Sequence, residues 1–220
     1  MCDNDETLAL EQKIDIFCEN RSSIPWGKDK YSDNDAKKFE EIYDSLKKIM
    51  KNKQKYKCCY CGASFIGSHE INIDVEHILP SSIFDLLTLY LNNISIACKR
   101  CNMGIKHDDL SFFKKDKDYY ETINKSKIIG NSLDYEIIHP NHDVYSDYIK
   151  KININHNEDI ISFFIKNFHK TKAAYHYNYF QLEKITRSYL DMIQGIEPRK
   201  TYLRASSVDM LKSGDGKISR

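Results

Sequence analysis

Apolar residues recur at three- and four-residue steps between Asn34 and Asn52, which is the period of a helix with one buried face. The apolar positions of this stretch are Phe39, Ile42, Tyr43, Leu46, Ile49 and Met50. Ser32, Asp33 and Asn34 are residue types that cap a helix start. The pattern predicts a long helix that packs on a core, preceded by a shorter helix from about Leu8 to Cys18.

Two short segments instead alternate apolar and polar residues, as half-buried strands do. They are Ile71 to Val75, which ends on the pair Glu76-His77, and Asn93 to Ala97. Ile83 to Leu91 is interpreted as helical, and Cys98 to about Phe113 as a turn that opens a helix. The order strand, loop, strand, helix is expected to bring the end of the first strand close to the start of the last helix.

The later part of the chain is polar and rich in Asn and Tyr before its apolar pattern returns. It predicts short strands at Tyr135 to Ile138 and at Ile152 to Ile154, and helices at Asp159 to His169 and at about Thr171 to Gln194. The expected fold class is therefore α+β and mostly helical.

Three regions follow from these patterns: an N-terminal arm and helix at 1–53, a small core at 54–115, and a mostly helical region at 116–220. With 220 residues and 41% apolar residues the chain is long enough to bury a core. It begins without an apolar leader, and Ile83 to Leu91, its longest apolar stretch, is too short to span a bilayer, so we expect a cytoplasmic protein with no membrane partner.

The cysteines fall into a pattern typical of metal binding. Cys58 and Cys61 form one C-x-x-C pair, and Cys98 and Cys101 form another, so four thiolates can close a tetrahedral structural Zn²⁺ site. Cys59 is adjacent to Cys58 and is an alternative ligand, although the two-residue gap favours Cys58. With Cys58 as the ligand, Cys2, Cys18 and Cys59 are expected to be free thiols, which a reducing compartment tolerates.

With the two cysteine pairs, the stretch Val75-Glu76-His77-Ile78-Leu79-Pro80, the stretch Asn93 to Cys98, and Cys101-Asn102 in this order, residues 54 to 115 resemble an HNH endonuclease. That family has the ββα-metal, or His-Me finger, fold, and some members carry a cysteine zinc frame. The resemblance implies hydrolysis of phosphodiester bonds in nucleic acid.

The resemblance also implies a role for each matching residue. His77 would be the general base that activates water, and Glu76 would bind a catalytic Mg²⁺ or Mn²⁺ ion, although the family more often has Asp there. Asn93 would fix the loop and the histidine ring by hydrogen bonds. Asn102 would complete the metal site where many relatives carry a second histidine.

Basic residues near the second cysteine pair are candidates for phosphate contacts. They are Lys99, Arg100 and Lys106. The family pattern usually has a lysine three residues after the position of Asn102, whereas Lys106 comes four residues after it, with His107 next as a possible neighbour of the metal. The net charge of +1 means that any basic surface must be local, or that a partner supplies the rest.

A wider resemblance involves the Ile24-Pro25-Trp26 arm and the stretch Ile138 to Asp143, which are similar to the HNH effectors of Septu-type and retron-associated anti-phage systems. Those effectors work beside an ATPase. The resemblance implies a toxic effector held in check by an ATPase partner. Trp26 itself is interpreted as a hydrophobic anchor that pins the arm to the body.

The alternative to a nuclease is a catalytically inactive, zinc-containing subunit that binds nucleic acid or protein. A C-x-x-C pair alone would favour it, but the candidate catalytic strand fills the gap between the pairs. The sequence leaves DNA and RNA open as substrates. The remaining histidines are interpreted as surface or core residues, namely His69, His139, His142, His156, His169 and His176.

Overall fold

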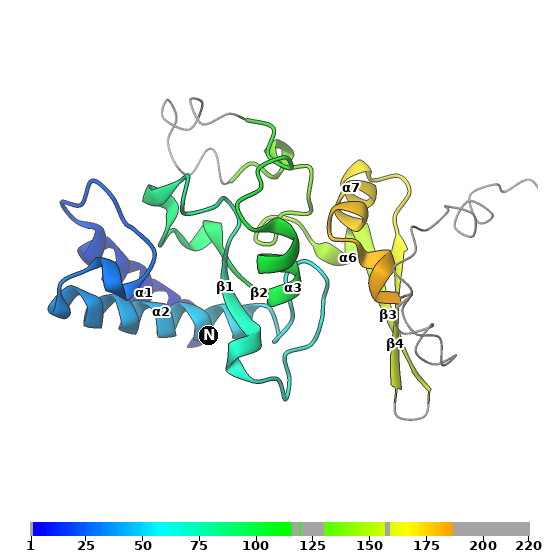
Figure 1. The fold of residues 1–220 in the computed structure, drawn as a ribbon, viewed down its shortest axis with the longest axis horizontal. Helices are drawn as coiled ribbons and strands as arrows, with labels where there is room; N and C mark the ends of the chain where they lie inside the picture. Colours follow the sequence, from blue (N-terminus) through cyan, green and yellow to red (C-terminus); the bar gives the residue numbers. More distant parts are fainter. Residues whose placement is uncertain (1, 116–118, 120–129, 157–158, 187–220) are drawn as a thin grey trace, which may run out of the picture.

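The computed structural model describes residues 2–115, 119, 130–156 and 159–186 and is a mixed α/β protein with two small antiparallel sheets (Figure 1). Its helices are α1 (Cys2–Cys18), α2 (Asp33–Lys53), α3 (Lys99–Cys101), α6 (Tyr145–Tyr148) and α7 (Thr171–Tyr179), and a π-helix spans Asn102–Lys106. The strands are β1 (Ile73–His77), β2 (Ile94–Cys98), β3 (Ile149–His156) and β4 (Asp159–Lys166). Short 3-10 turns lie at Lys28–Lys30, Glu70–Asn72, Asp85–Leu87, Leu91–Asn93 and Ser132–Asp134.

The predicted amphipathic helix is confirmed as α2, which buries Phe39, Ile42, Leu46 and Met50 on one face. Acidic residues occupy its first turn and lysines its last turn, as the helix dipole favours. Helix α1 is longer than the pattern predicted and lies along α2 at one end of the molecule (Figure 1). Trp26 lies edge-on to the ring of Phe39, which agrees with its predicted role as an anchor of the arm.

Both predicted strands of the central hairpin are present with shifted ends, and β1 is antiparallel to β2 with Glu76 opposite Ser95. Strand β1 begins two residues later than predicted and includes Glu76 and His77, and almost every position of both strands is buried, so they are not half-buried. Gln54, which follows α2, fixes this hairpin to the helix: its Oε1 accepts hydrogen bonds from the Ser95 hydroxyl and the Ile96 amide. Side chains of neighbouring residues on a strand point to opposite faces. Glu76 and His77 therefore lie on opposite faces of β1.

The helix expected at Ile83 to Leu91 is wrong, because this stretch contains only the 3-10 turns Asp85–Leu87 and Leu91–Asn93. The physical reason lies in its carbonyl groups. The carbonyl of Leu87 accepts a hydrogen bond from the Tyr90 amide and another from the Asn93 side chain, so it is not used in an α-helical bond four residues on.

The helix expected at Asp159 to His169 is also wrong, because Asp159–Lys166 is β4, paired along its length with β3. Its run of β-branched and aromatic residues fits a pleated strand once a partner strand is present. The strand at Ile152 to Ile154 is confirmed and extends over Ile149–His156. In Figure 1 this second hairpin extends away from the central one.

At Tyr135 to Ile138 the structure holds only an isolated bridge between Tyr135 and Phe113. The amide of Ile138 donates to the His176 side chain and not to a strand. The long helix expected from Thr171 is interrupted after Tyr179, where Gln181 has a φ of 50°, and residues 182–186 are helical again. Its predicted end near Gln194 lies outside the described residues.

The core is one cluster that joins α2, the central hairpin and α7. Among the described residues, no helix combines the length and the apolar character needed to cross a bilayer.

Candidate metal centre and the neighbouring Glu76-His77 pair

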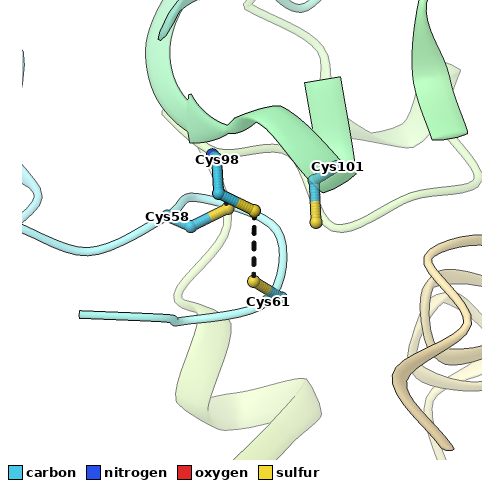
Figure 2. Close-up of side chains that lie close together, drawn as sticks. All are labelled: Cys58, Cys61, Cys98 and Cys101. Atoms are coloured by element: carbon cyan, nitrogen blue, oxygen red, sulfur yellow. Dashed lines mark hydrogen bonds between the residues drawn. The ribbon is translucent and has the colours of Figure 1, made fainter. Parts of the chain in front are cut away.

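Four cysteines converge as the sequence predicted, and they could hold a metal ion: the sulfur atoms of Cys58, Cys61, Cys98 and Cys101 all lie within 4.8 Å of one another (Figure 2). The Sγ atoms of Cys61 and Cys98 are 3.8 Å apart. A tetrahedral zinc site with Zn–S bonds of about 2.3 Å has sulfur atoms about 3.8 Å apart. The donor set and this spacing therefore fit a structural zinc ion.

The first cysteine pair is presented by a tight turn. The amide of Gly62 donates to the carbonyl of Cys58, and the amide of Cys58 donates to the carbonyl of Ala63. Gly62 has a φ of 62°, in the left-handed region that a glycine adopts without steric cost. The second pair comes from the end of β2 and from α3, so a metal here would join two segments about forty residues apart in the chain.

Cys59 is half-buried and lies outside the group of four, which supports Cys58 as the ligand. Burial raises the pKa of the Cys58 thiol, so this group would be protonated without a cation nearby. Metal binding would release that proton, which makes metal affinity depend on pH.

The turn is tied to the rest of the molecule by side chains from later segments. His176 accepts the Ile138 amide hydrogen bond at Nδ1, so its Nε2–H donates to the Tyr60 carbonyl at 2.8 Å. The Lys151 ammonium donates to the Gly62 carbonyl, and the Arg100 guanidinium donates to the carbonyls of Phe180 and Gln181. The cysteine group thus lies at the junction of the central hairpin, β3 and α7.

Glu76 points toward this junction and is fully buried. Its Oε1 is 2.8 Å from the Lys106 ammonium and accepts a hydrogen bond of 2.8 Å from the Tyr60 hydroxyl. Burial raises the pKa of the Glu76 carboxyl, while the Lys106 charge and the Tyr60 hydroxyl oppose that rise. The carboxylate is thus neutralised by a partner from the same chain.

Among the described residues, no hydrogen bond joins Asn102 to Glu76. Its side-chain amide donates to Asp74 Oδ2 at 3.2 Å, and Lys99 contacts the other oxygen of Asp74 at 2.9 Å. Carboxylate and amide oxygens are the donors that Mg²⁺ and Mn²⁺ prefer, so the chemistry of Glu76 and Asn102 fits a catalytic ion. Both groups are engaged with other side chains, however, and their role as metal ligands stays a prediction.

His77 lies on the other face of β1. Its Nε2 is 2.9 Å from the Thr88 carbonyl, and its ring meets the Trp26 ring edge-on, with centroids 4.4 Å apart. Burial lowers the pKa of His77 to about 4, so the imidazole is neutral at pH 7. Because a carbonyl only accepts, the proton sits on Nε2 and the lone pair is on Nδ1, which has no hydrogen-bond partner among the described residues.

Asn93 fixes the loop that follows His77. Its Oδ1 accepts from the Leu79 amide, and its Nδ2 donates to the carbonyls of Leu79 and Leu87. The same loop carries the Thr88 carbonyl that contacts the ring. Asn93 therefore acts on the histidine through the loop and not by direct contact.

The candidate phosphate contacts all have partners within the chain: Lys99 pairs with Asp74, Arg100 with two carbonyls, and Lys106 with Glu76. Lys99 keeps half of its side chain exposed, whereas Lys106 is fully buried. His107 and His142 are exposed, and no described contact joins either to Glu76. A hollow of about 420 Å³ lies between α1 and α2, but none of the residues that line it is a candidate site residue.

Lys106 reaches Glu76 from the end of the π-helix Asn102–Lys106, whose turn is wider than that of an α-helix. Asp74 and Tyr60 were missed at the sequence level: Asp74 could have been found, since it shares a strand face with Glu76, but nothing in the C-x-x-C pair signals Tyr60.

Comparison of the chain with protein-family models, with curated proteins and with solved structures gives no match. The function of the chain is therefore inferred from its own residues and their geometry.

Proposed function

We propose that this chain is a metal-dependent HNH endonuclease that hydrolyses phosphodiester bonds of nucleic acid. The observation that carries the proposal is the state of His77: a neutral imidazole at the end of β1 with Nε2–H directed at the Thr88 carbonyl and Nδ1 free of described partners. A general base needs a lone pair on an oriented group. The adjacent carboxylate and the cysteine group are further support.

In the proposed reaction, Nδ1 of His77 takes a proton from the attacking water. Thr88 keeps the ring in the tautomer that leaves Nδ1 unprotonated, and Asn93 positions the loop that carries the Thr88 carbonyl. Glu76 and Asn102 would hold Mg²⁺ or Mn²⁺. When bound, such an ion supplies a Lewis acid that stabilises charge on the phosphate and the leaving oxygen. The zinc at the four cysteines would be structural, because four thiolates leave no open position.

We further propose that the enzyme is the toxic effector of an anti-phage system and works with an ATPase partner. The sequence resemblance to Septu-type effectors supports this. The closure of the site also supports it: Trp26 lies against His77, and Lys106 neutralises Glu76. A toxic nuclease that is inactive until a partner acts would need such a resting arrangement.

The second candidate is a zinc-containing binding subunit without catalysis. The internal pairing of Glu76 and of all three candidate phosphate contacts favours it, because a decayed site has no need of free ligands.

The test is a cleavage assay on plasmid, single-stranded DNA and total tRNA, with Mg²⁺ or Mn²⁺, for the chain alone and together with any ATPase encoded beside it. The His77→Ala variant is expected to lose cleavage by about 10²- to 10⁴-fold, the usual contribution of a general base. His169→Ala, an exposed histidine, is the matched control and should cleave as wild type does. Equal cleavage by wild type and His77→Ala would remove His77 from the mechanism, and no cleavage of any substrate would favour the binding subunit.

A further inference from the structure

The Glu76–Lys106 pair is unusual because it lies inside the proposed ion site. Each side chain is only 1% exposed, and the Lys106 Nζ is 2.8 Å from Oε1. Both described contacts of the Glu76 side chain use that one oxygen. A buried carboxylate needs a cation, and here the chain itself supplies one.

The backbone that delivers Lys106 is irregular. A π-helix (Asn102–Lys106) carries the lysine, and the next residue, His107, has φ 44° and ψ −122° while its amide donates to the Asn102 carbonyl. A residue with a side chain adopts such a conformation only at a cost, and it persists only where surrounding contacts enforce it. The buried ion pair is the contact at the end of this segment.

The same short segment carries both proposed functional groups. Asn102 begins the π-helix and contacts Asp74, and Lys106 ends it and contacts Glu76. A change of this segment from its π-helical form would therefore move the ammonium and the amide together. π-helical turns are often found at functional sites for this kind of reason.

We propose that Lys106 is an internal counter-cation, which occupies the Glu76 carboxylate and keeps the divalent-ion site closed until the segment from Asn102 to His107 moves. This inference rests on the proposed function, since it takes Glu76 as a ligand of the ion. Exchange of the ammonium for a divalent cation keeps the carboxylate paired, so neither state leaves a buried charge alone. Only open molecules can bind the ion. The apparent affinity is therefore the affinity of the open form multiplied by the fraction of molecules that are open, which is small.

The first test measures Mn²⁺ binding to zinc-loaded protein, by electron paramagnetic resonance of free Mn²⁺. Lys106→Met keeps the length of the side chain but removes its charge, and we expect it to bind Mn²⁺ at least tenfold more tightly than wild type. The double variant Lys106→Met/Glu76→Gln should lose that gain. Equal affinity in wild type and a folded Lys106→Met variant would overturn the proposal.

Lys172→Met is the matched control, because Lys172 is also a buried lysine paired with a carboxylate, Asp143, at 2.9 Å. Asp143 differs in that its two oxygens also accept from the Ser132 hydroxyl and the His139 amide. The control should leave Mn²⁺ affinity unchanged. A gain as large as that of Lys106→Met would mean that any lost buried lysine creates affinity, and this would overturn the proposal.

The second test uses the wild-type protein, so that it does not depend on the folding of a variant. Lysines are acetylated briefly with and without saturating Mn²⁺, and the modified positions are found by mass spectrometry. Lys106 should be protected without Mn²⁺ and labelled at least fivefold faster with it, whereas Lys172 should stay protected in both. Protection of Lys106 at the highest Mn²⁺ concentration would show a permanent structural pair and overturn the proposal.

These outcomes are separable from the cleavage assay. A protein that cleaves through His77 but whose Mn²⁺ affinity does not respond to Lys106→Met would keep the proposed function and lose the counter-cation. A protein that cleaves nothing but gains Mn²⁺ affinity through Glu76 would keep the cation exchange and lose the nuclease.

Discussion

The two faces of β1 are closed in different ways. On one face Glu76 is buried beside the cysteine group and is paired through a charge and a hydroxyl, from Lys106 and Tyr60. On the other face His77 is buried beneath the N-terminal arm, against the Trp26 ring and one carbonyl. The proposed metal ligand is thus covered by a polar group and the proposed base by an aromatic one.

Because one face is closed by a charge and the other by an aromatic ring, the two faces should respond to different agents. A cation competes with Lys106 for Glu76, but it has no effect on an aromatic contact. Displacement of the arm by a partner would uncover His77 but leave the ion pair intact. If the chain is a restrained nuclease, two separate events are therefore needed before both Glu76 and His77 are uncovered.

The largest effect is expected on the cysteine side. Cys101→Ser removes one of four thiolates from a fully buried position and should release the metal, with an unfolding midpoint lower by roughly 10 °C or more, because a structural zinc ion supplies folding free energy. Zinc content and thermal unfolding followed by circular dichroism measure this. Cys59→Ser is the matched control and should retain zinc; loss of zinc in Cys59→Ser alone would place the ligand at Cys59 and not at Cys58.

Acid pH should weaken both sides of the hairpin through buried neutral histidines. Burial lowers the pKa of His77 to about 4, of His139 to about 3 and of His176 to about 4. Because these values lie below the unfolded value of about 6.5, the unfolded chain binds protons first as the pH falls. Stability is therefore full above pH 6.5 and decreases between pH 6.5 and about 4, by up to about 1.4 kcal/mol per pH unit for each histidine.

Urea unfolding at pH 7, 6 and 5 measures this loss, with zinc content determined at each pH so that metal release is recognised. His176→Gln should reduce the slope by the share of one histidine, because protonation at Nδ1 would oppose the Ile138 amide hydrogen bond. His169→Gln, at an exposed position, should leave the slope unchanged. A stability that is flat from pH 7 to pH 5 would contradict the neutral, buried state of these rings.

How much of the fold the sequence could predict depends on how far apart along the chain the interacting residues lie. The helix α2, the hairpin β1–β2 and the cysteine group follow from periodicity and spacing, which are local signals. The strand β4 was predicted as a helix because its apolar run fits either structure, and only pairing with β3 decides between them.

At the site, the sequence placed Glu76 beside His77 but could not show that their side chains diverge and acquire separate partners. Those partners come from distant positions: Trp26 from the arm, and Tyr60 and Lys106 from either side of the hairpin. The π-helix that brings Lys106 to Glu76 has no pattern of its own in the sequence.

On the aromatic side, Trp26→Ala should destabilise the protein by about 2–3 kcal/mol, somewhat less than for a fully buried ring, because Trp26 is half-buried. It should also uncover His77, so modification of His77 by diethyl pyrocarbonate should become faster. Unfolding is followed by circular dichroism, since Trp26 is the only tryptophan. Trp26→Phe keeps a ring and should lose less; unchanged modification of His77 in Trp26→Ala would mean that the arm does not cover it.

The smallest effect concerns the residue after Lys106. His107 has φ 44° and ψ −122°, a region that glycine enters without steric cost. His107→Gly should therefore relieve backbone strain, but glycine also loses more conformational entropy on folding. The net effect is expected to be a stabilisation of about 1 kcal/mol. Asp108→Gly, the neighbouring position with no positive φ, should instead lose up to about 1 kcal/mol. The strain belongs to the closed form, so its relief stabilises that form and should also weaken Mn²⁺ binding about fivefold. The rate of modification of His77, which lies on the other face of β1, should not change. A His107→Gly variant that bound Mn²⁺ more tightly would place the strain in the open form and reverse this side of the comparison.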